Sequence, residues 1–145
     1  MSTAVLILLG LLGGVAVGLQ GPLSSLMSSK IGIMESIFIV HLGGAILAIV
    51  PLLLFWGGGN LSQWRSVPWY ALGAGAMGLV VIGAVSITIP RLGVAPTVTL
   101  IVVAQLIVGA ILDQYGWLGV HIRPIDTTRI IGMLVLFFGT WLMVK

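Results

Sequence analysis

The chain has 145 residues, of which 59% are apolar and only 6% are charged. A soluble domain has about 25% charged residues, so this chain lacks the polar surface that a water-soluble globule needs. Its net charge of +3 comes from single Lys and Arg residues near segment ends, which excludes the clustered basic face of a nucleic-acid-binding protein. Because cysteine is absent, disulfides and thiolate metal sites are excluded as well. Composition predicts an integral membrane protein that uses no metal, cofactor or nucleic acid.

Five apolar stretches are each long enough to cross a bilayer core as a helix, which takes about 20 residues. We predict an all-α membrane protein with a single transmembrane domain over residues 1–145. Its five transmembrane helices are expected at about 3–25, 34–56, 68–89, 94–112 and 128–144. The tryptophans fall near the predicted helix ends, at headgroup depth, and they are Trp56, Trp64, Trp69, Trp117 and Trp141. No basic region precedes the first stretch and no cleavage site follows it, so we expect a retained span rather than a signal peptide.

The first predicted span carries glycine at every fourth position, at Gly10, Gly14 and Gly18. This spacing places the three glycines on one helix face, where a neighbouring backbone can approach closely. We therefore predict that this face is a helix-packing surface. Gln20 puts an amide in the same apolar run, and a Gln20-Gly21-Pro22 break is expected near the end of the span. The amide either lines a substrate path or bonds to another helix.

A short turn over Ser28–Gly32 is predicted to hold Lys30 and to lead into the second span. Glu35 stands in the first turn of that span, either as a proton or cation site facing a cavity or as a solvated carboxylate at the interface. His41 lies deeper, as a protonation switch or as a hydrogen-bonded packing residue. A turn over residues 57–60, rich in glycine, ends the span.

The third span begins at Pro68 and contains the spacing Gly73-x-Gly75-x-x-Gly78. The same spacing occurs in dinucleotide-binding loops, but here it follows no strand and lies within an apolar helix. We interpret Gly75 and Gly78 as helix-packing positions instead. A tight connector over 90–93 is expected before the fourth span.

The fourth span contains Gln105, whose amide lines a path or bonds to another helix, and it is followed by Asp113. We predict that Asp113 pairs with Arg123 or Arg129 in a structural role. Asp126 is predicted to cap the last span, because a carboxylate before the first turn accepts free backbone N–H groups.

The basic residues near the predicted helix ends divide equally between the two membrane faces. One side carries Arg65, Arg123 and Arg129, and the other carries Lys30, Arg91 and Lys145. Since the Lys and Arg count over short loops normally sets topology, this balance predicts that copies insert in both orientations. Opposed copies would form an antiparallel ten-helix dimer with inverted pseudo-symmetry. The alternative is one orientation, selected by segment hydrophobicity or by a partner protein.

Several short motifs occur in one order over almost the whole chain. They are Gln20-x-x-x-Ser24-x-Leu26, Pro90-x-Leu92-Gly93, Gln105 with Asp113-x-x-Gly116-x-x-Gly119, and Arg129-x-x-Gly132 with Gly139. Together they resemble the YdcZ-like inner-membrane proteins of the drug/metabolite transporter superfamily. Ser24 stands where that pattern often has an asparagine. The related small multidrug resistance proteins use an acidic residue in the first helix, which this chain lacks, so cation antiport through such a residue is not implied.

The resemblance implies a half-transporter in the cell inner membrane that exports or exchanges a small metabolite and works as a homodimer or with a sister subunit. In an inverted pair, alternating access would follow from the exchange of two equivalent states, and we expect Glu35 or His41 to carry any coupling to protons. The predicted substrate-binding residues are Gln20, Ser24, Glu35, His41 and Gln105. The alternative is a non-transporting scaffold or accessory subunit of a larger complex. No nucleophile with a matching base is apparent, so an enzyme is not expected.

Overall fold

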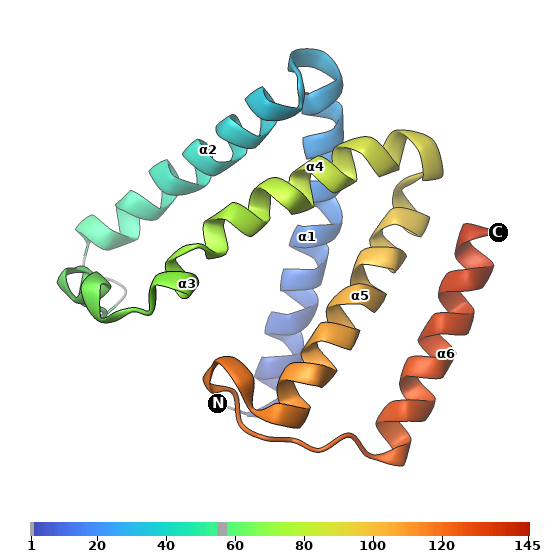
Figure 1. Ribbon diagram of the computed structural model, residues 1–145. Coiled ribbons are helices and arrows are strands. Elements are labelled where there is room, and N and C mark those ends of the chain that lie inside the picture. Colours follow the sequence, from blue (N-terminus) through green and yellow to red (C-terminus); the bar gives the residue numbers. More distant parts are fainter. Residues whose placement is uncertain (1, 55–57) are drawn as a thin grey trace. The chain divides into compact units, whose positions relative to one another are not determined.

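The computed structural model describes residues 2–54 and 58–145, and the regular structure within these ranges is entirely helical. The chain divides into two compact units, Met1–Pro90 and Arg91–Lys145 (Figure 1). Five stretches are long and apolar enough to span a membrane: α1 (Thr3–Ile31), α2 (Ile33–Leu53), α3 (Trp69–Leu72) continued by α4 (Ala74–Leu92), α5 (Val94–Tyr115) and α6 (Thr127–Val144). Short 3-10 helices cover Leu61–Ser66 and Trp117–Gly119. The prediction of five membrane-spanning helices is thereby confirmed.

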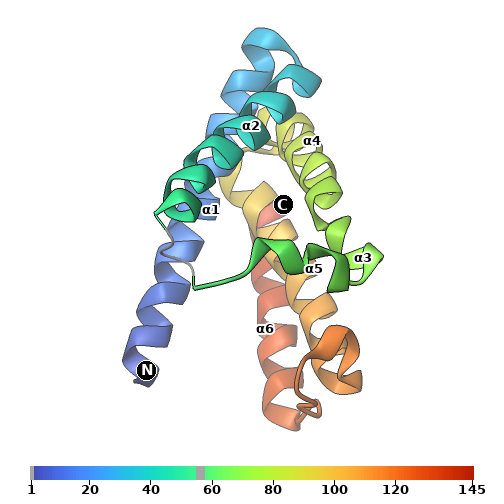
Figure 2. The same ribbon diagram turned by 90° about the vertical axis from the view of Figure 1, so that its left-hand side faces the viewer.

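In the first unit, α1 and α2 form a helical hairpin that turns on a single residue, Gly32 (Figures 1 and 2). Gly32 has φ 103°, a backbone conformation that L side chains rarely adopt, so a glycine here allows a one-residue turn. Gly93, with φ 89°, separates α4 from α5 in the same way. Long spans can therefore follow one another with almost no loop.

Contacts between α1, α2 and α4 are made by hydroxyl groups and by a glycine. The Ser28 and Ser86 hydroxyls lie 2.7 Å apart, joining α1 to α4, and the Ser36 hydroxyl of α2 donates to the Ser24 carbonyl of α1 at 3.2 Å. At Gly21 of α1, a Cβ would lie 3.5 Å from the Ile89 side chain of α4. Small side chains let these helices approach closely, and each hydroxyl has a hydrogen-bond partner on a neighbouring helix, either a second hydroxyl or a backbone carbonyl.

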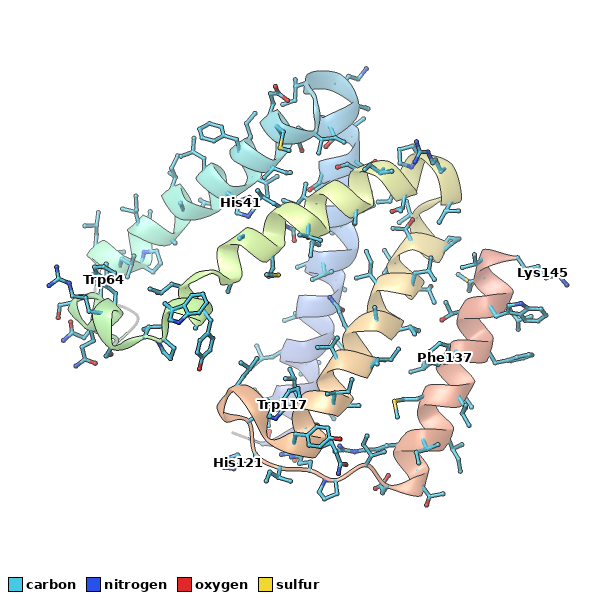
Figure 3. All side chains as sticks on the ribbon, in the orientation of Figure 1. His41, Trp64, Trp117, His121, Phe137 and Lys145 are labelled. Atoms are coloured by element: carbon cyan, nitrogen blue, oxygen red, sulfur yellow. The ribbon has the colours of Figure 1, made fainter. Side chains whose placement is uncertain are left out.

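Buried side chains in the described residues are more often polar than apolar. The buried apolar residues are Ile37, Ile82, Val85 and Val103, and the buried polar ones are Ser24, Ser25, Ser28, Ser36, Ser86, Thr97 and Thr140. Large apolar side chains cover the outside of every span (Figure 3). This pattern reverses that of a water-soluble protein, as expected for helices whose solvent is lipid.

In the second unit, α5 and α6 run side by side in opposite directions, joined by residues 116–126 (Figures 1 and 2). The connecting segment is bonded to the end of α5, because the Arg123 N–H donates to the Asp113 carbonyl at 2.8 Å and the Ile125 N–H donates to the Gln114 side chain at 2.7 Å. The Asp126 carboxylate accepts the Arg129 N–H at 2.7 Å, which makes Asp126 the N-cap of α6 as predicted.

Three predicted breaks are wrong, because the helices continue through them. The helix α1 passes through Gln20-Gly21-Pro22 and through most of the predicted Ser28–Gly32 turn, ending at Ile31. Pro90 likewise lies inside α4, which ends at Leu92. A proline removes only one backbone donor, and in lipid the other backbone groups still gain most from staying in a helix. With 29 residues, α1 is about 44 Å long and exceeds a hydrocarbon core of about 30 Å, so it tilts or projects from the bilayer.

Other helix bounds differ from the predicted ones by a turn or less. The third span is interrupted at Gly73, which separates α3 from α4, and Pro68 precedes α3 rather than lying within it. The helix α5 extends to Tyr115, three residues beyond the predicted end, so Asp113 is helical. The helix α6 begins at Thr127, one residue early. The predicted end of the second span and Trp56 lie outside the described residues.

The predicted packing glycines divide into two groups. A Cβ at Gly78 would collide with the His41 ring, so this glycine allows α4 to lie against α2. At Gly10, Gly14, Gly18 and Gly75, no described atom lies within 4 Å of the Cβ position, apart from near neighbours in their own helices. Their expected packing role therefore stays a prediction about contacts outside this chain.

Candidate functional site

A groove of about 400 Å³ lies between α5 and α6, within the second unit. This volume is in the range of small-molecule sites, which run from about 300 to 1,000 Å³. The residues lining it are Gln105, Leu106, Gly109, Ala110, Asp113, Arg129, Gly132, Met133 and Leu136. Three residues that the sequence singled out for their polar groups, Gln105, Asp113 and Arg129, therefore share one groove.

The α5 wall of the groove is set by helical periodicity. Gln105, Gly109 and Asp113 are spaced at four-residue intervals, which places them on one face of the helix. Gln105 is eleven residues after Val94 and ten before Tyr115, so its amide is halfway along the span. In a helix that crosses the bilayer, this is the depth of the midplane, where transporters hold their substrates.

The groove is open because its floor is made of small residues. Gly109 and Ala110 on α5 and Gly132 on α6 leave room between the helices, while Leu106, Met133 and Leu136 form apolar walls. The apolar residues can bury the body of a ligand, and the polar groups at the midpoint and at the charged end can orient it, as in other small-molecule sites.

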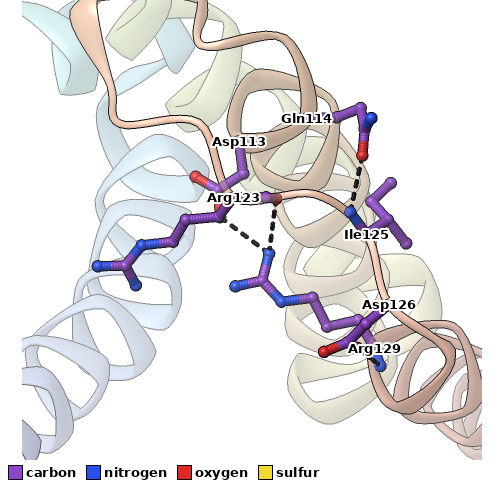
Figure 4. Close-up of polar contacts among 6 residues, drawn as sticks. All are labelled: Asp113, Gln114, Arg123, Ile125, Asp126 and Arg129. Carbon is purple, nitrogen blue, oxygen red and sulfur yellow. Dashed lines mark hydrogen bonds and ion pairs between the residues drawn. The ribbon is translucent and has the colours of Figure 1, made fainter.

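Charge at the site comes from an ion pair at one end of the groove (Figure 4). Arg129 Nη1 lies 3.4 Å from Asp113 Oδ2 and donates to the Arg123 carbonyl at 3.2 Å. The Asp113 and Arg129 side chains are 38% and 37% exposed, so the pair is partly open to its surroundings. The predicted partner of Asp113 is thus Arg129, and Arg123 takes part only through its backbone. At this exposure the pair is a weak stabiliser, because solvent screens it.

Gln20 and Ser24 lie four residues apart on α1 with different surroundings. The Gln20 side chain is exposed and has no hydrogen-bond partner among the described residues. Ser24 is 2% exposed, and its carbonyl accepts the Ser36 hydroxyl. Ser24 is thus placed in the α1–α2 contact rather than on a surface open to a solute.

Glu35 lies at the N-terminus of α2, with its carboxylate folded back over Gly32. Negative charge is favoured at this end of a helix, and the side chain is exposed. A shallow surface pocket there is lined by Met34, Glu35, Phe38 and Ile39. The two alternatives that the sequence left open for Glu35, a site facing a cavity and an interfacial carboxylate, stay predictions.

His41 lies between α2 and α4, with its ring against Gly78 (Figure 3). Its Nδ1 is 2.8 Å from the Ile37 carbonyl, and a carbonyl oxygen accepts but cannot donate. Nδ1 therefore carries the hydrogen when this bond forms, which leaves Nε2 as the acceptor in the neutral ring. His41 therefore has the hydrogen-bonded packing role that was one of its two expected roles, and the protonation switch stays a prediction.

Sequence reasoning missed Gly109 and Gly132 as parts of the site. Gly109 lies midway between Gln105 and Asp113, so the signal was present once the helix is known to continue to Asp113. Gly132 follows Arg129 by three residues, on the same side of α6. The predicted end of the span at 112 put Asp113 in a loop and hid this periodicity.

The chain was compared with known protein families, curated proteins and solved structures. The family model described as "Putative inner membrane exporter, YdcZ" matches residues 5–142. No curated protein and no solved structure matches the chain significantly.

Because the chain contains no cysteine, single cysteines can be introduced to test whether water reaches the groove. We expect a water-soluble maleimide to label Gln105→Cys at least about a hundredfold faster than Val108→Cys, since a thiol surrounded by lipid does not form the reactive thiolate. Val108 is the matched control, being on α5, 56% exposed and outside the groove lining. Equal labelling of the two variants in liposomes, measured by mass spectrometry, would contradict a hydrated groove.

Proposed function

Because the chain belongs to the YdcZ family and is a multi-pass protein of the inner membrane, we propose that it is a half-transporter that exports a small metabolite by alternating access. The α5–α6 groove forms part of the substrate path. The observation that carries this proposal is the position of Gln105, at mid-span on a groove with the Asp113–Arg129 pair at one end.

Polar groups at membrane depth need hydrogen-bond partners that lipid does not supply. An amide with no partner in hydrocarbon costs several kcal/mol, so an amide in mid-span indicates either a protein partner or a hydrated space. Gln105 is exposed in this chain and lines a groove that has room for a solute. A solute path supplies the polar surroundings that lipid would not.

Pairing of two copies is supported by features of the first unit. The Gln20 amide is exposed on α1 without a described partner, and a second protomer would supply one. Gly10, Gly14 and Gly18 leave the same helix open to close approach. With the basic residues balanced between the two faces, an antiparallel pair is the arrangement that we favour.

Alternating access follows from the symmetry of such a pair. If two identical chains adopt different shapes, exchange of those shapes turns an inward-open dimer into an outward-open one. The two states have equal energy when both membrane faces are alike, so substrate binding does not have to offset a free-energy difference between them.

His41 is the group through which we propose that protons couple to transport. Its Nδ1 is held by the Ile37 carbonyl, and its Nε2 lies against Gly78 of α4 without a hydrogen-bond partner among the described residues. The charged residues of the first unit are Lys30, Glu35 and Arg65, of which Glu35 is nearest in the chain and lies at the end of α2. A proton on His41 would therefore change the charge of a region that is otherwise neutral.

A steric test of the substrate path uses two glycines of α6. We expect Gly132→Leu, which fills the groove floor, to reduce efflux at least about tenfold, or about 1.4 kcal/mol of transition-state free energy. Gly139→Leu is the control, because Gly139 is on the same helix, has open space around it and does not line the groove. Proteoliposomes loaded with a ¹³C-labelled extract of small metabolites, followed by mass spectrometry of the medium, measure the efflux.

Equal efflux from the two leucine variants would remove the α5–α6 groove from the path. Wild-type protein that moves no component of the extract, yet copurifies with a defined larger complex, would favour the scaffold function instead.

The proton-coupling proposal predicts that His41→Gln keeps the dimer but flattens the dependence of efflux on pH. His121→Gln is the matched control, because His121 lies in the segment between α5 and α6 and should leave the pH profile unchanged. Efflux measured at several pH values in the same proteoliposomes checks this. A wild-type pH profile in His41→Gln would reject His41 as the coupling group.

The antiparallel dimer predicts that C-terminal reporters are found on both sides of the membrane. Two double variants test this. One combines Lys30→Gln with Lys145→Gln and removes two positive charges from one face, and the other combines Arg65→Gln with Arg123→Gln and removes two from the opposite face. The two variants should therefore insert in opposite orientations. Each double variant alone should lose most of its efflux, and coexpression of the two should restore it. Reporters confined to one side in the wild type, or full efflux from one double variant, would overturn the antiparallel arrangement.

A further inference from the structure

We propose that the α5–α6 groove binds a small amphipathic carboxylate, held through the Nε and Nη2 edge of the Arg129 guanidinium, which makes no hydrogen bond among the described residues. The inference rests on the proposed function, since it names the substrate class of the same groove. Three features of the site support it: the hydrogen-bond donors of Arg129, the charged and polar groups around them, and the apolar residues between Arg129 and Gln105.

Arg129 has more donors than partners. A guanidinium carries five N–H groups, and the two on Nη1 are used by Asp113 Oδ2 at 3.4 Å and the Arg123 carbonyl at 3.2 Å. The Nε and Nη2 groups have no hydrogen-bond partner among residues 2–54 and 58–145. This edge presents parallel donors, which is the geometry that binds a carboxylate through two oxygens.

Asp113 acts as a positioning residue in this arrangement. It contacts Arg129 through one oxygen only, and with the Arg123 carbonyl it fixes the orientation of the guanidinium (Figure 4). The ligand carboxylate takes the opposite edge, so the pair does not have to break when the ligand binds. Asp126 does not occupy that edge, since its Oδ1 accepts the backbone N–H of Arg129 and no ion pair joins its carboxylate to the Arg129 side chain among the described residues.

The rest of the groove selects the body of the ligand. Gln105 is eight residues from Asp113 along α5, or about 12 Å at a rise of about 1.5 Å per residue. Leu106, Met133 and Leu136 line the interval, so a short apolar chain is accommodated between the charged end and the amide. A ligand with a carboxylate and a short apolar body pairs with Arg129 and packs against the apolar interval, and it ends short of the Gln105 amide.

The anionic group that binds Arg129 could come from two sources, the carboxylate of a free metabolite or the phosphate of a membrane lipid. The Gln105 amide at mid-span favours the metabolite, because the acyl chains of a lipid with its headgroup at Arg129 would place hydrocarbon against that amide. The experiment below separates the two sources by lipid composition.

The test uses the full chain in phosphatidylcholine nanodiscs, with hexanoate as the probe and hexylammonium as its cationic counterpart, measured by isothermal titration calorimetry. We expect hexanoate to bind and hexylammonium not to bind. Arg129→Gln should weaken hexanoate binding at least about tenfold, as expected for loss of a charge-assisted hydrogen bond. Arg123→Gln is the matched control and should bind as the wild type does, because Arg123 contributes only its backbone.

Three further variants separate a binding role from a structural one. Arg129→Lys keeps the charge but loses the paired donors, so it should fold and bind with intermediate affinity. Asp113→Asn should weaken binding less than Arg129→Gln does, and Asp113→Glu should restore it, as expected for a positioning residue. Hexanoate binding that is unchanged in Arg129→Lys and Arg129→Gln would overturn the proposal, as would hexylammonium binding that is lost in Asp113→Asn.

The lipid arm and the efflux assay complete the design. If hexanoate still binds in nanodiscs that contain phosphatidylglycerol, the ligand of the site is a free metabolite. If hexanoate binding is lost there, the site binds lipid and the proposal is overturned. Hexanoate binding without efflux of any solute supports the inference and rejects the proposed function. Efflux of solutes that lack a carboxylate, with no hexanoate binding, rejects the inference and leaves the proposed function standing.

Discussion

Satisfaction of polar groups in a lipid solvent is the constraint on which the rest of this structure depends. Hydrocarbon offers no hydrogen bonds, so the backbone remains helical through Pro22 and Pro90, and polar side chains turn toward other helices. The Ser28–Ser86 and Ser36–Ser24 contacts follow from this, since each pairs polar groups that lipid would leave without a partner. Lipid removes the hydrophobic drive between spans, so such contacts and close packing of small residues hold the helices together.

The same constraint gives the groove its significance. A groove remains between α5 and α6, and the small residues that line it lie beside Gln105, Asp113 and Arg129. Within the first unit, Ser24 and Ser36 are bonded in a helix contact and Gln20 has no described partner, whereas within the second unit Gln105, Asp113 and Arg129 line one groove. A polar group at membrane depth that has no hydrogen-bond partner is costly, unless a solute, water or another protein chain supplies a partner. This difference is why the second unit is the better candidate for the solute path.

Much of the fold followed from the sequence, because span length and the scarcity of charge are decided by the thickness and polarity of the bilayer. The spans and the Asp126 cap are local properties of the chain, and the Asp113–Arg129 pair was one of two pairings that its charges allowed. Helix ends were less predictable. Proline and glycine end helices readily in water, but lipid penalises a free backbone group, so α1, α4 and α5 run further than their residues indicate.

The sequence by itself determined that this is a five-span membrane protein with balanced charge and a few polar groups within its helices. Only the tertiary structure decided which of those groups meet. It joined Gln105 to Asp113 and Arg129 across two helices, moved Ser24 into a helix contact, and set His41 against Gly78. The physical reason is that span formation depends on the transfer of single residues into lipid, whereas a site depends on the rotation and register of one helix against another, which no single helix encodes.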